Sequence, residues 1–72
     1  SVPRDVSVIG CDDIEMAAFY DPALTTIRQE RRLLGRRAAE LLGARLDGRD
    51  APGEVVAVTL VERGTTGPAP QL

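Results

Sequence analysis

The sequence predicts an α/β fold in which short strands alternate with helices. Three runs rich in β-branched residues are short enough to be strands, and one short and one long helical stretch separate them. The apolar side chains are mostly Val, Leu, Ile and Ala, with one Tyr, one Phe and no Trp, and such residues fill α/β layers. We therefore expect the order strand, short helix, strand, long helix, strand.

The first strand is expected at residues 6–9, a Val-Ser-Val-Ile run that ends at Gly10. Asp13 is placed to be the N-cap of a short helix over residues 14–20. That helix must end before Pro22, because a proline pushes the preceding residue into extended geometry. The first part of the chain thus predicts a strand followed directly by a helix.

The second strand is expected at residues 24–28, and a longer helix begins at Gln29 or Glu30. Gly48 supplies the C-terminal stop of this helix, and residues 54–62 carry the strongest strand pattern in the chain. On a 3.6-residue period the long helix has one broad apolar stripe, made of Leu34, Ala38, Leu41, Leu42 and Leu46. Three short strands cannot cover this stripe, so we expect additional sheet from elsewhere in the polypeptide.

Composition and charge restrict the classes of function. The 72 residues are 43% apolar and 28% charged, which is typical of packed structure rather than of a disordered segment. The net charge of −2 lacks the basic excess that binding to a nucleic-acid backbone needs. Cys11 is the only cysteine and histidine is absent, which excludes an internal disulfide framework and a zinc cluster and favours a reducing, cytoplasmic setting. The apolar runs are too short for a membrane span.

Two adjacent carboxylates, Asp12 and Asp13, follow the first expected strand. Ligands of open α/β sheets bind outside the carboxyl ends of the strands, so a ligand site is one interpretation. The alternative is that both aspartates only cap the following helix. A division of roles is also open, in which Asp13 caps and Asp12 accepts hydrogen bonds from hydroxyl or amine groups of a ligand. No His, Cys cluster or third acid accompanies the pair at a spacing typical of a catalytic or metal site, so we expect neither an enzyme nor a bound metal or cofactor.

Arg31 differs from the other arginines because it lies within the apolar stripe, in the first turn of the long helix. Its head can bend outward to water, or it can turn inward and meet an anionic ligand or a carboxylate such as Asp12. A similar choice applies to the apolar side chains of the short helix, because both cores and interfaces favour Met, Phe and Tyr. These side chains are Met16, Phe19 and Tyr20. The pattern alone leaves both choices open.

Four separated segments carry motifs in a recognisable order and spacing, at residues 6–13, 22–29, 34–42 and 60–66. They include an Asp-Asp pair, a Leu-Thr-Thr strand and an Arg-Gly-Thr-Thr ending. Together they resemble the C-terminal region of the effector-binding domain of LacI/GalR transcriptional regulators. A match through several separated motifs is more specific than a single glycine pattern.

The resemblance implies a segment of a two-lobed, periplasmic-binding-protein-like sensor that binds a small, sugar-like effector between its lobes. Residues 1–66 would form the C-terminal segment of this sensor, and residues 67–72 a flexible tail. The strand at residues 25–29 and the one beginning near Val55 would cross between the lobes, with the long helix packed on the N-terminal lobe. Operator DNA would be bound by a homodimer through an N-terminal helix-turn-helix that this chain lacks, without involvement of a membrane.

By the same resemblance, Asp12 contacts the effector, and Gln29 and Arg31 complete the ligand-binding set. Arg31 stands where some members present an aromatic side chain, and Cys11 replaces an aromatic that is common at its position. The resemblance also assigns three residues to the dimer interface, namely Met16, Phe19 and Tyr20. The competing class is a periplasmic sugar- or solute-binding protein of the same fold. A helix-turn-helix or a secretory signal peptide upstream would decide between the two.

Overall fold

A small sheet holds the chain together in the computed structural model of the protein, which describes residues 1–71. Its central strand is β2 (Thr25–Arg28). β1 (Ile9–Cys11) pairs with β2 in parallel on one side, and β3 (Thr59–Val61) pairs with it antiparallel on the other. The sheet is therefore mixed, and its strands follow the spatial order β1-β2-β3.

Two helices connect the strands in the predicted order. The connection from β1 to β2 contains a 3₁₀ helix, η1 (Glu15–Ala18), and the connection from β2 to β3 contains α1 (Arg31–Leu46). The predicted order of strand, short helix, strand, long helix, strand is confirmed. Gly48, with a φ of 76°, lies just beyond the end of α1, where a left-handed residue ends a helix, as predicted.

The boundaries of the outer strands differ from the prediction. β1 begins at Ile9 rather than at residue 6, because Val8 exchanges hydrogen bonds with Thr65, in the segment after β3, instead of with β2. The third strand was expected over residues 54–62, but only Thr59–Val61 is paired. β2 has four residues and offers no partner to the earlier part of that run, which lies beside α1 instead.

The short helix also differs from the prediction. It is a single 3₁₀ turn whose N-cap is Ile14, and no side chain caps it. The prediction that Asp13 caps this helix is wrong, because its carboxylate forms ion pairs with Arg28 and Arg63 instead. Pro22 follows the turn, as expected from its effect on the preceding residue.

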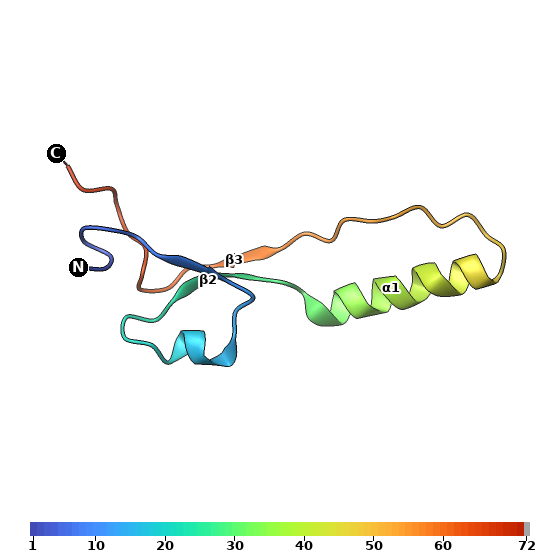
Figure 1. The fold of residues 1–72 in the computed structure, drawn as a ribbon, viewed down its shortest axis with the longest axis horizontal. Helices are drawn as coiled ribbons and strands as arrows, with labels where there is room; N and C mark the ends of the chain where they lie inside the picture. Colours follow the sequence, from blue (N-terminus) through green and yellow to red (C-terminus); the bar gives the residue numbers. More distant parts are fainter. Residues whose placement is uncertain (72) are drawn as a thin grey trace.

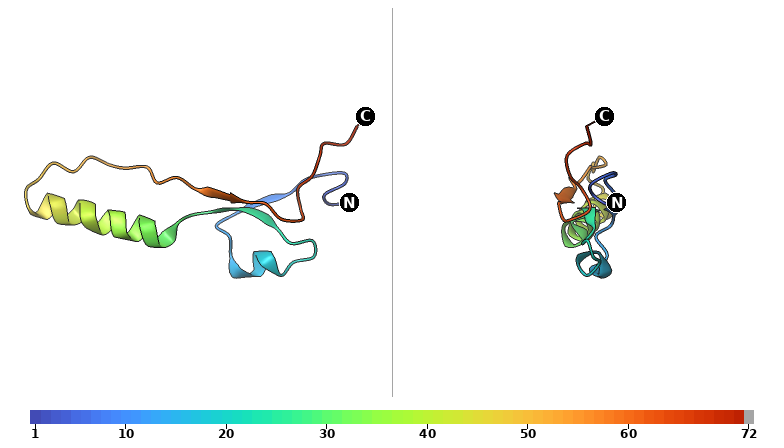
Figure 2. Two further views of the ribbon diagram at one scale, coloured as in Figure 1. Left: turned by 180° about the vertical axis from the view of Figure 1, so that it is seen from behind. Right: turned by 90° about the vertical axis from the view of Figure 1, so that its left-hand side faces the viewer.

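The long connection forms an arm, which we define as α1 together with residues 47–58. Figure 1 shows α1 pointing away from the sheet and the following segment running back beside it to β3, and the left view of Figure 2 shows the same from behind. The chain measures 59 × 27 × 10 Å, with a radius of gyration of 18.0 Å. A compact chain of this length would have a radius of about 11 Å. The described residues thus form an elongated, thin unit.

Few side chains are buried in this unit. Within residues 1–71, the buried apolar residues are Ala17 and Ala51, and the buried polar ones are Thr25, Thr26 and Thr65. No residue of α1 is buried, and Leu42 and Leu46 of the apolar stripe are 60% and 79% exposed. The stripe lacks the sheet that the sequence analysis expected it to need.

Candidate functional site

The carboxyl ends of β1 and β2 lie side by side, because the two strands are parallel with Cys11 opposite Ile27. Asp12 follows β1 at this edge, and its backbone N–H donates to the carbonyl of Ile27 at 2.8 Å. Its side chain is exposed, and the Cys11 thiol donates to its Oδ1 at 3.6 Å. The Asp12 carboxylate therefore has acceptor positions open to solvent at the edge where ligands of such sheets bind.

Asp13 is held from three sides. Its backbone N–H donates to Thr26 Oγ1 at 3.1 Å, and its carboxylate accepts from Arg28 Nε at 2.8 Å and lies 2.9 Å from Arg63 Nη1. The side chain is 13% exposed. The hydrogen bonds from Arg28 and then Arg63 lower the pKa of the Asp13 carboxyl below its usual value, despite partial desolvation. We call Asp13, Arg28 and Arg63 the Asp13 cluster.

Three threonines, which we call the threonine hub, join β1, β2 and the segment after β3. Thr65 Oγ1 accepts from the backbone N–H of Thr25 at 2.9 Å and donates to the carbonyl of Val8 at 2.6 Å. Thr25 Oγ1 shares a hydrogen bond of 2.9 Å with Thr66 Oγ1 and accepts from the backbone N–H of Arg63 at 2.9 Å. Buried hydroxyls here supply hydrogen bonds that the short strands do not make.

Neither the Asp13 cluster nor the threonine hub was predicted from the sequence pattern. Arg28 carried no distinguishing pattern, since a lone arginine on a strand is usually solvated, and Arg63 stood out only as part of the Arg-Gly-Thr-Thr motif, which names no partner for it. A signal was present for the hub, because Thr-Thr pairs stand at residues 25–26 and 65–66. A hydroxyl within an otherwise apolar strand indicates a specific hydrogen bond.

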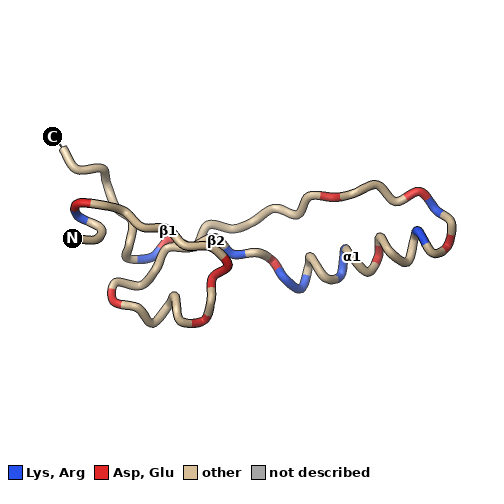
Figure 3. Tube along the Cα trace, viewed as in Figure 1, with Lys and Arg blue, Asp and Glu red and all other residues tan. Residues whose placement is uncertain are grey.

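Gln29 and Arg31 lie at the junction of β2 and α1, and both side chains are exposed. Figure 3 shows basic residues at this junction, close to the acidic turn that follows β1. Within the described residues, Arg31 forms no ion pair with a carboxylate. The inward contact with Asp12 that the sequence left open is not formed here.

A pocket of about 100 Å³ lies between the start of α1 and the returning segment of the arm. Its lining is mostly apolar and consists of Gln29, Glu30, Leu34, Val56, Ala57 and Val58. Glu30 Oε1 accepts from Thr59 Oγ1 at 3.3 Å near the same place. Gln29 is the one predicted ligand-binding residue that lines this pocket.

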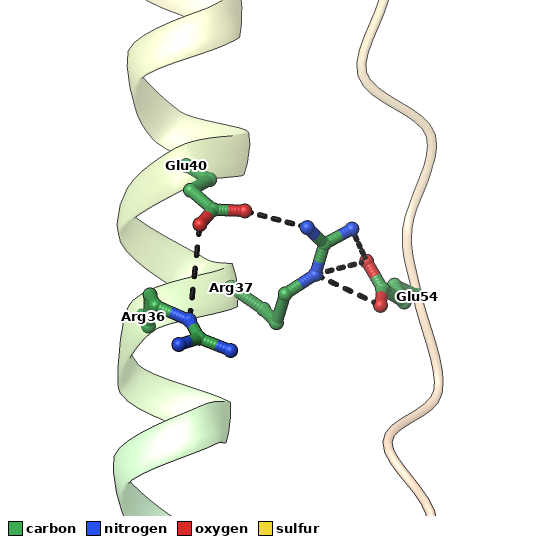
Figure 4. Close-up of polar contacts among 4 residues, drawn as sticks. All are labelled: Arg36, Arg37, Glu40 and Glu54. Carbon is green, nitrogen blue, oxygen red and sulfur yellow. Dashed lines mark hydrogen bonds and ion pairs between the residues drawn. The ribbon is translucent and has the colours of Figure 1, made fainter.

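Further along the arm, Arg37 of α1 joins the helix to the returning segment. Figure 4 shows its guanidinium between Glu40 on the same helix and Glu54 on the returning segment. The Nη2 nitrogen lies 2.6 Å from Glu54 Oε2. Glu54 raises the pKa of Arg37, and Arg37 lowers the pKa of Glu54 below its usual value. This pairing fixes the arm but lies away from Asp12.

The three residues predicted at a dimer interface lie on or directly after η1. Met16, Phe19 and Tyr20 are all exposed, Phe19 by 75%. They form no part of a core within residues 1–71. Their neighbour Ala17 is fully buried, and its carbonyl accepts from the N–H of Leu24. The turn is thus anchored by its small residue while its large apolar side chains face outward.

The described residues contain no helix that is both long and apolar enough to cross a membrane. They also contain no cluster of His, Cys, Asp or Glu side chains suited to a metal ion.

Residues 1–66 match a protein family described as the periplasmic binding protein-like domain. The chain belongs to this family. The predicted fold class, a segment of a periplasmic-binding-protein-like α/β sensor, is therefore confirmed.

The relatives of this periplasmic binding protein-like chain are transcriptional regulators. The HTH-type transcriptional repressor PurR of Pectobacterium carotovorum is 41% identical over 73 residues, covering 99% of this chain and 21% of that protein. The HTH-type transcriptional regulator MalR of Streptomyces coelicolor is 44% identical over 71 residues, covering 96% of this chain and 21% of that protein. The chain spans about a fifth or less of the length of the curated relatives it matches.

Solved structures of LacI family regulators contain the same arrangement. A regulator from Bifidobacterium animalis matches with a TM-score of 0.87 and 34% identity, over 96% of this chain and 26% of its own. A regulator from Enterococcus faecium with bound ribose matches with a TM-score of 0.75 and 35% identity, over 100% of this chain and 27% of its own. One from Arthrobacter in complex with lactose matches with a TM-score of 0.73 and 36% identity, over 93% of this chain and 27% of its own. The resemblance to LacI/GalR regulators is confirmed, and these relatives are named as regulators rather than as enzymes.

Proposed function

We propose that this chain is the C-terminal part of the effector-binding domain of a longer, cytoplasmic LacI-type regulator. It binds a small, sugar-like effector in a cleft between two lobes, and operator DNA is bound by a separate helix-turn-helix. The supporting observation is the exposed Asp12 carboxylate at the shared carboxyl edge of β1 and β2. The net charge of −2 is in keeping with a segment that does not itself bind DNA.

The effector site is assembled at this edge. Asp12 accepts hydrogen bonds from effector hydroxyls, and Gln29 and Arg31 donate to the effector from the junction of β2 and α1. Two of the similar regulators are described with ribose or lactose, which supports a polyol as the effector class. Arg31 adds a positive charge at the junction of β2 and α1 and allows an effector that also carries an anionic group.

The test uses the intact regulator that carries this sequence. A thermal-shift screen with ribose, lactose and their phosphorylated derivatives selects the compound that binds most tightly, and calorimetry then measures its affinity. Asp12→Asn should weaken that affinity by about 1.5–3 kcal/mol, the usual contribution of a hydrogen bond to a charged group. Asp21→Asn, which changes an exposed acid beyond η1, is the matched control. Equal affinity in the Asp12→Asn variant and the control would remove Asp12 from the site.

The regulator acts as a homodimer, and Met16, Phe19 and Tyr20 lie at its subunit contact. Their exposure supports this, because large apolar side chains grouped on a surface mark interfaces. Two-fold symmetry also suits a protein that binds paired operator half-sites. Phe19→Asp should shift sedimentation toward monomer, whereas Phe19→Leu should retain the dimer. A dimer that survives Phe19→Asp would place the interface elsewhere.

A further inference from the structure

The turn that carries Asp12 has an unusual backbone. Asp12 and Asp13 have φ values of 82° and 45°, and both are non-glycine residues in the left-handed region. Aspartate tolerates this region better than most residues, but two in succession require restraint from their surroundings. The direction of the Asp12 carboxylate therefore depends on what holds the turn.

Hydrogen bonds to β2 and the Asp13 cluster together supply that restraint. The backbone N–H groups of Asp12 and Asp13 each donate across to β2, to the Ile27 carbonyl and to Thr26 Oγ1. Arg28 and Arg63 fix the Asp13 side chain from two other directions. Arg63 is itself fixed, because its Nη1 donates to the carbonyl of Leu24 at 3.0 Å and its backbone N–H donates to the threonine hub.

We propose that Arg28 and Arg63, acting through Asp13, are positioning residues that set the direction of the Asp12 carboxylate. This inference rests on the proposed function, in which Asp12 contacts the effector. Asp13 then has a different role from its neighbour: it holds the turn, and it contacts no effector. The Asp13 carboxylate is fixed by two guanidinium groups, whereas the Asp12 carboxylate remains open to the effector.

Amide hydrogen exchange tests the positioning without any effector. In the intact regulator, mass spectrometry with fragmentation resolves exchange at the amides of Asp12 and Asp13, which both donate to β2. Asp13→Asn and Arg63→Gln should each speed exchange at these amides by about tenfold, because they remove a charged restraint on a locally opening turn. Arg28→Lys keeps the charge and the single bond to Asp13, and exchange should stay within about twofold.

Glu54→Gln is the control, since it breaks an arginine–carboxylate pair of the same chemistry in the arm. It should leave the amides of Asp12 and Asp13 unchanged. Unchanged exchange there in both Asp13→Asn and Arg63→Gln, or equal acceleration in Glu54→Gln, would overturn the inference. If Asp13→Asn does not fold, Arg28→Gln, which alters a half-exposed side chain, is measured instead with the same expected acceleration. Failure of the proposed function would appear separately, as unchanged effector affinity in Asp12→Asn.

Discussion

The sheet and the arm are stabilised in different ways. In the sheet, Thr25 and Thr65 are buried and hydrogen-bonded to strands far apart in the sequence. In the arm, every residue of α1 is accessible to solvent, and the contacts to the returning segment are polar, as at Arg37 and Glu54. The sheet thus has its partners within this chain, whereas the apolar face of the arm needs partners from outside it.

The largest expected effect concerns the chain in isolation. Residues 1–72 alone should show no cooperative unfolding transition as a compact monomer, because the two apolar residues buried within residues 1–71 do not form a core. Calorimetry and sedimentation of the dilute peptide measure this directly. A sharp transition from a compact monomer would show that the arm is stable without external partners and would remove the difference between the two regions.

A substitution in the apolar stripe tests whether the arm packs on a part of the regulator outside this chain. Leu42→Ala should destabilise the intact regulator by about 2–5 kcal/mol if the stripe packs on another lobe, as for other buried leucines. In the isolated chain it should leave the helical circular dichroism unchanged, because Leu42 is exposed there. Denaturant unfolding of the intact regulator measures the loss of stability, with Arg32→Ala, outside the stripe, as control. An intact regulator that is as stable with Leu42→Ala as with Arg32→Ala would contradict external packing.

In the sheet, Thr65→Val should destabilise the intact regulator by about 2–3 kcal/mol. It leaves the N–H of Thr25 and the carbonyl of Val8 without their hydroxyl partner. Thr66→Val removes one bond from a less buried residue and should cost less than about 1.5 kcal/mol. Denaturant unfolding distinguishes the two variants. A larger loss of stability for Thr66→Val than for Thr65→Val would contradict these hydrogen-bond assignments in the threonine hub.

The smallest expected effect is on the pH dependence of stability. The pKa of the Asp13 carboxyl is lowered in the folded chain by Arg28 and Arg63, so its ion pairs contribute fully above its unfolded pKa. Acidification below about pH 4 should remove that contribution as the pH falls through the folded pKa. The melting temperature of the intact regulator should therefore fall less steeply on acidification in Asp13→Asn. Superimposable pH profiles would show that Asp13 is not held as described.

Sequence reasoning predicted the elements of the fold well and the polar contacts poorly. β-Branched runs and the apolar stripe are local patterns, so the order of elements and the end of α1 near Gly48 could be predicted. Asp13 was wrongly expected to cap η1, because its partners Arg28 and Arg63 are 15 and 50 positions away in the sequence. Such pairings depend on strand register, which local pattern does not contain.

The assignment of Asp12, Gln29 and Arg31 to the effector site remains a prediction. The structure places Asp12 at the edge that the strand pattern predicted, because β1 and β2 pair in parallel, although β3, which also follows a helix, pairs antiparallel. It places Gln29 and Arg31 at the neighbouring junction. Under the proposed function, the side-chain directions of these residues depend on the rest of the effector-binding domain, which neither the sequence pattern nor this segment contains.

The position of Thr65 has a consequence for synthesis. Thr65 binds Thr25 and Val8, which leave the ribosome 40 and 57 residues earlier. Until the later threonine emerges, the backbone N–H of Thr25 and the carbonyl of Val8 have only water or a chaperone as partners. These hydrogen bonds are therefore completed only after residue 65 has emerged, and a ribosome that stalls before that residue would leave both groups unpaired.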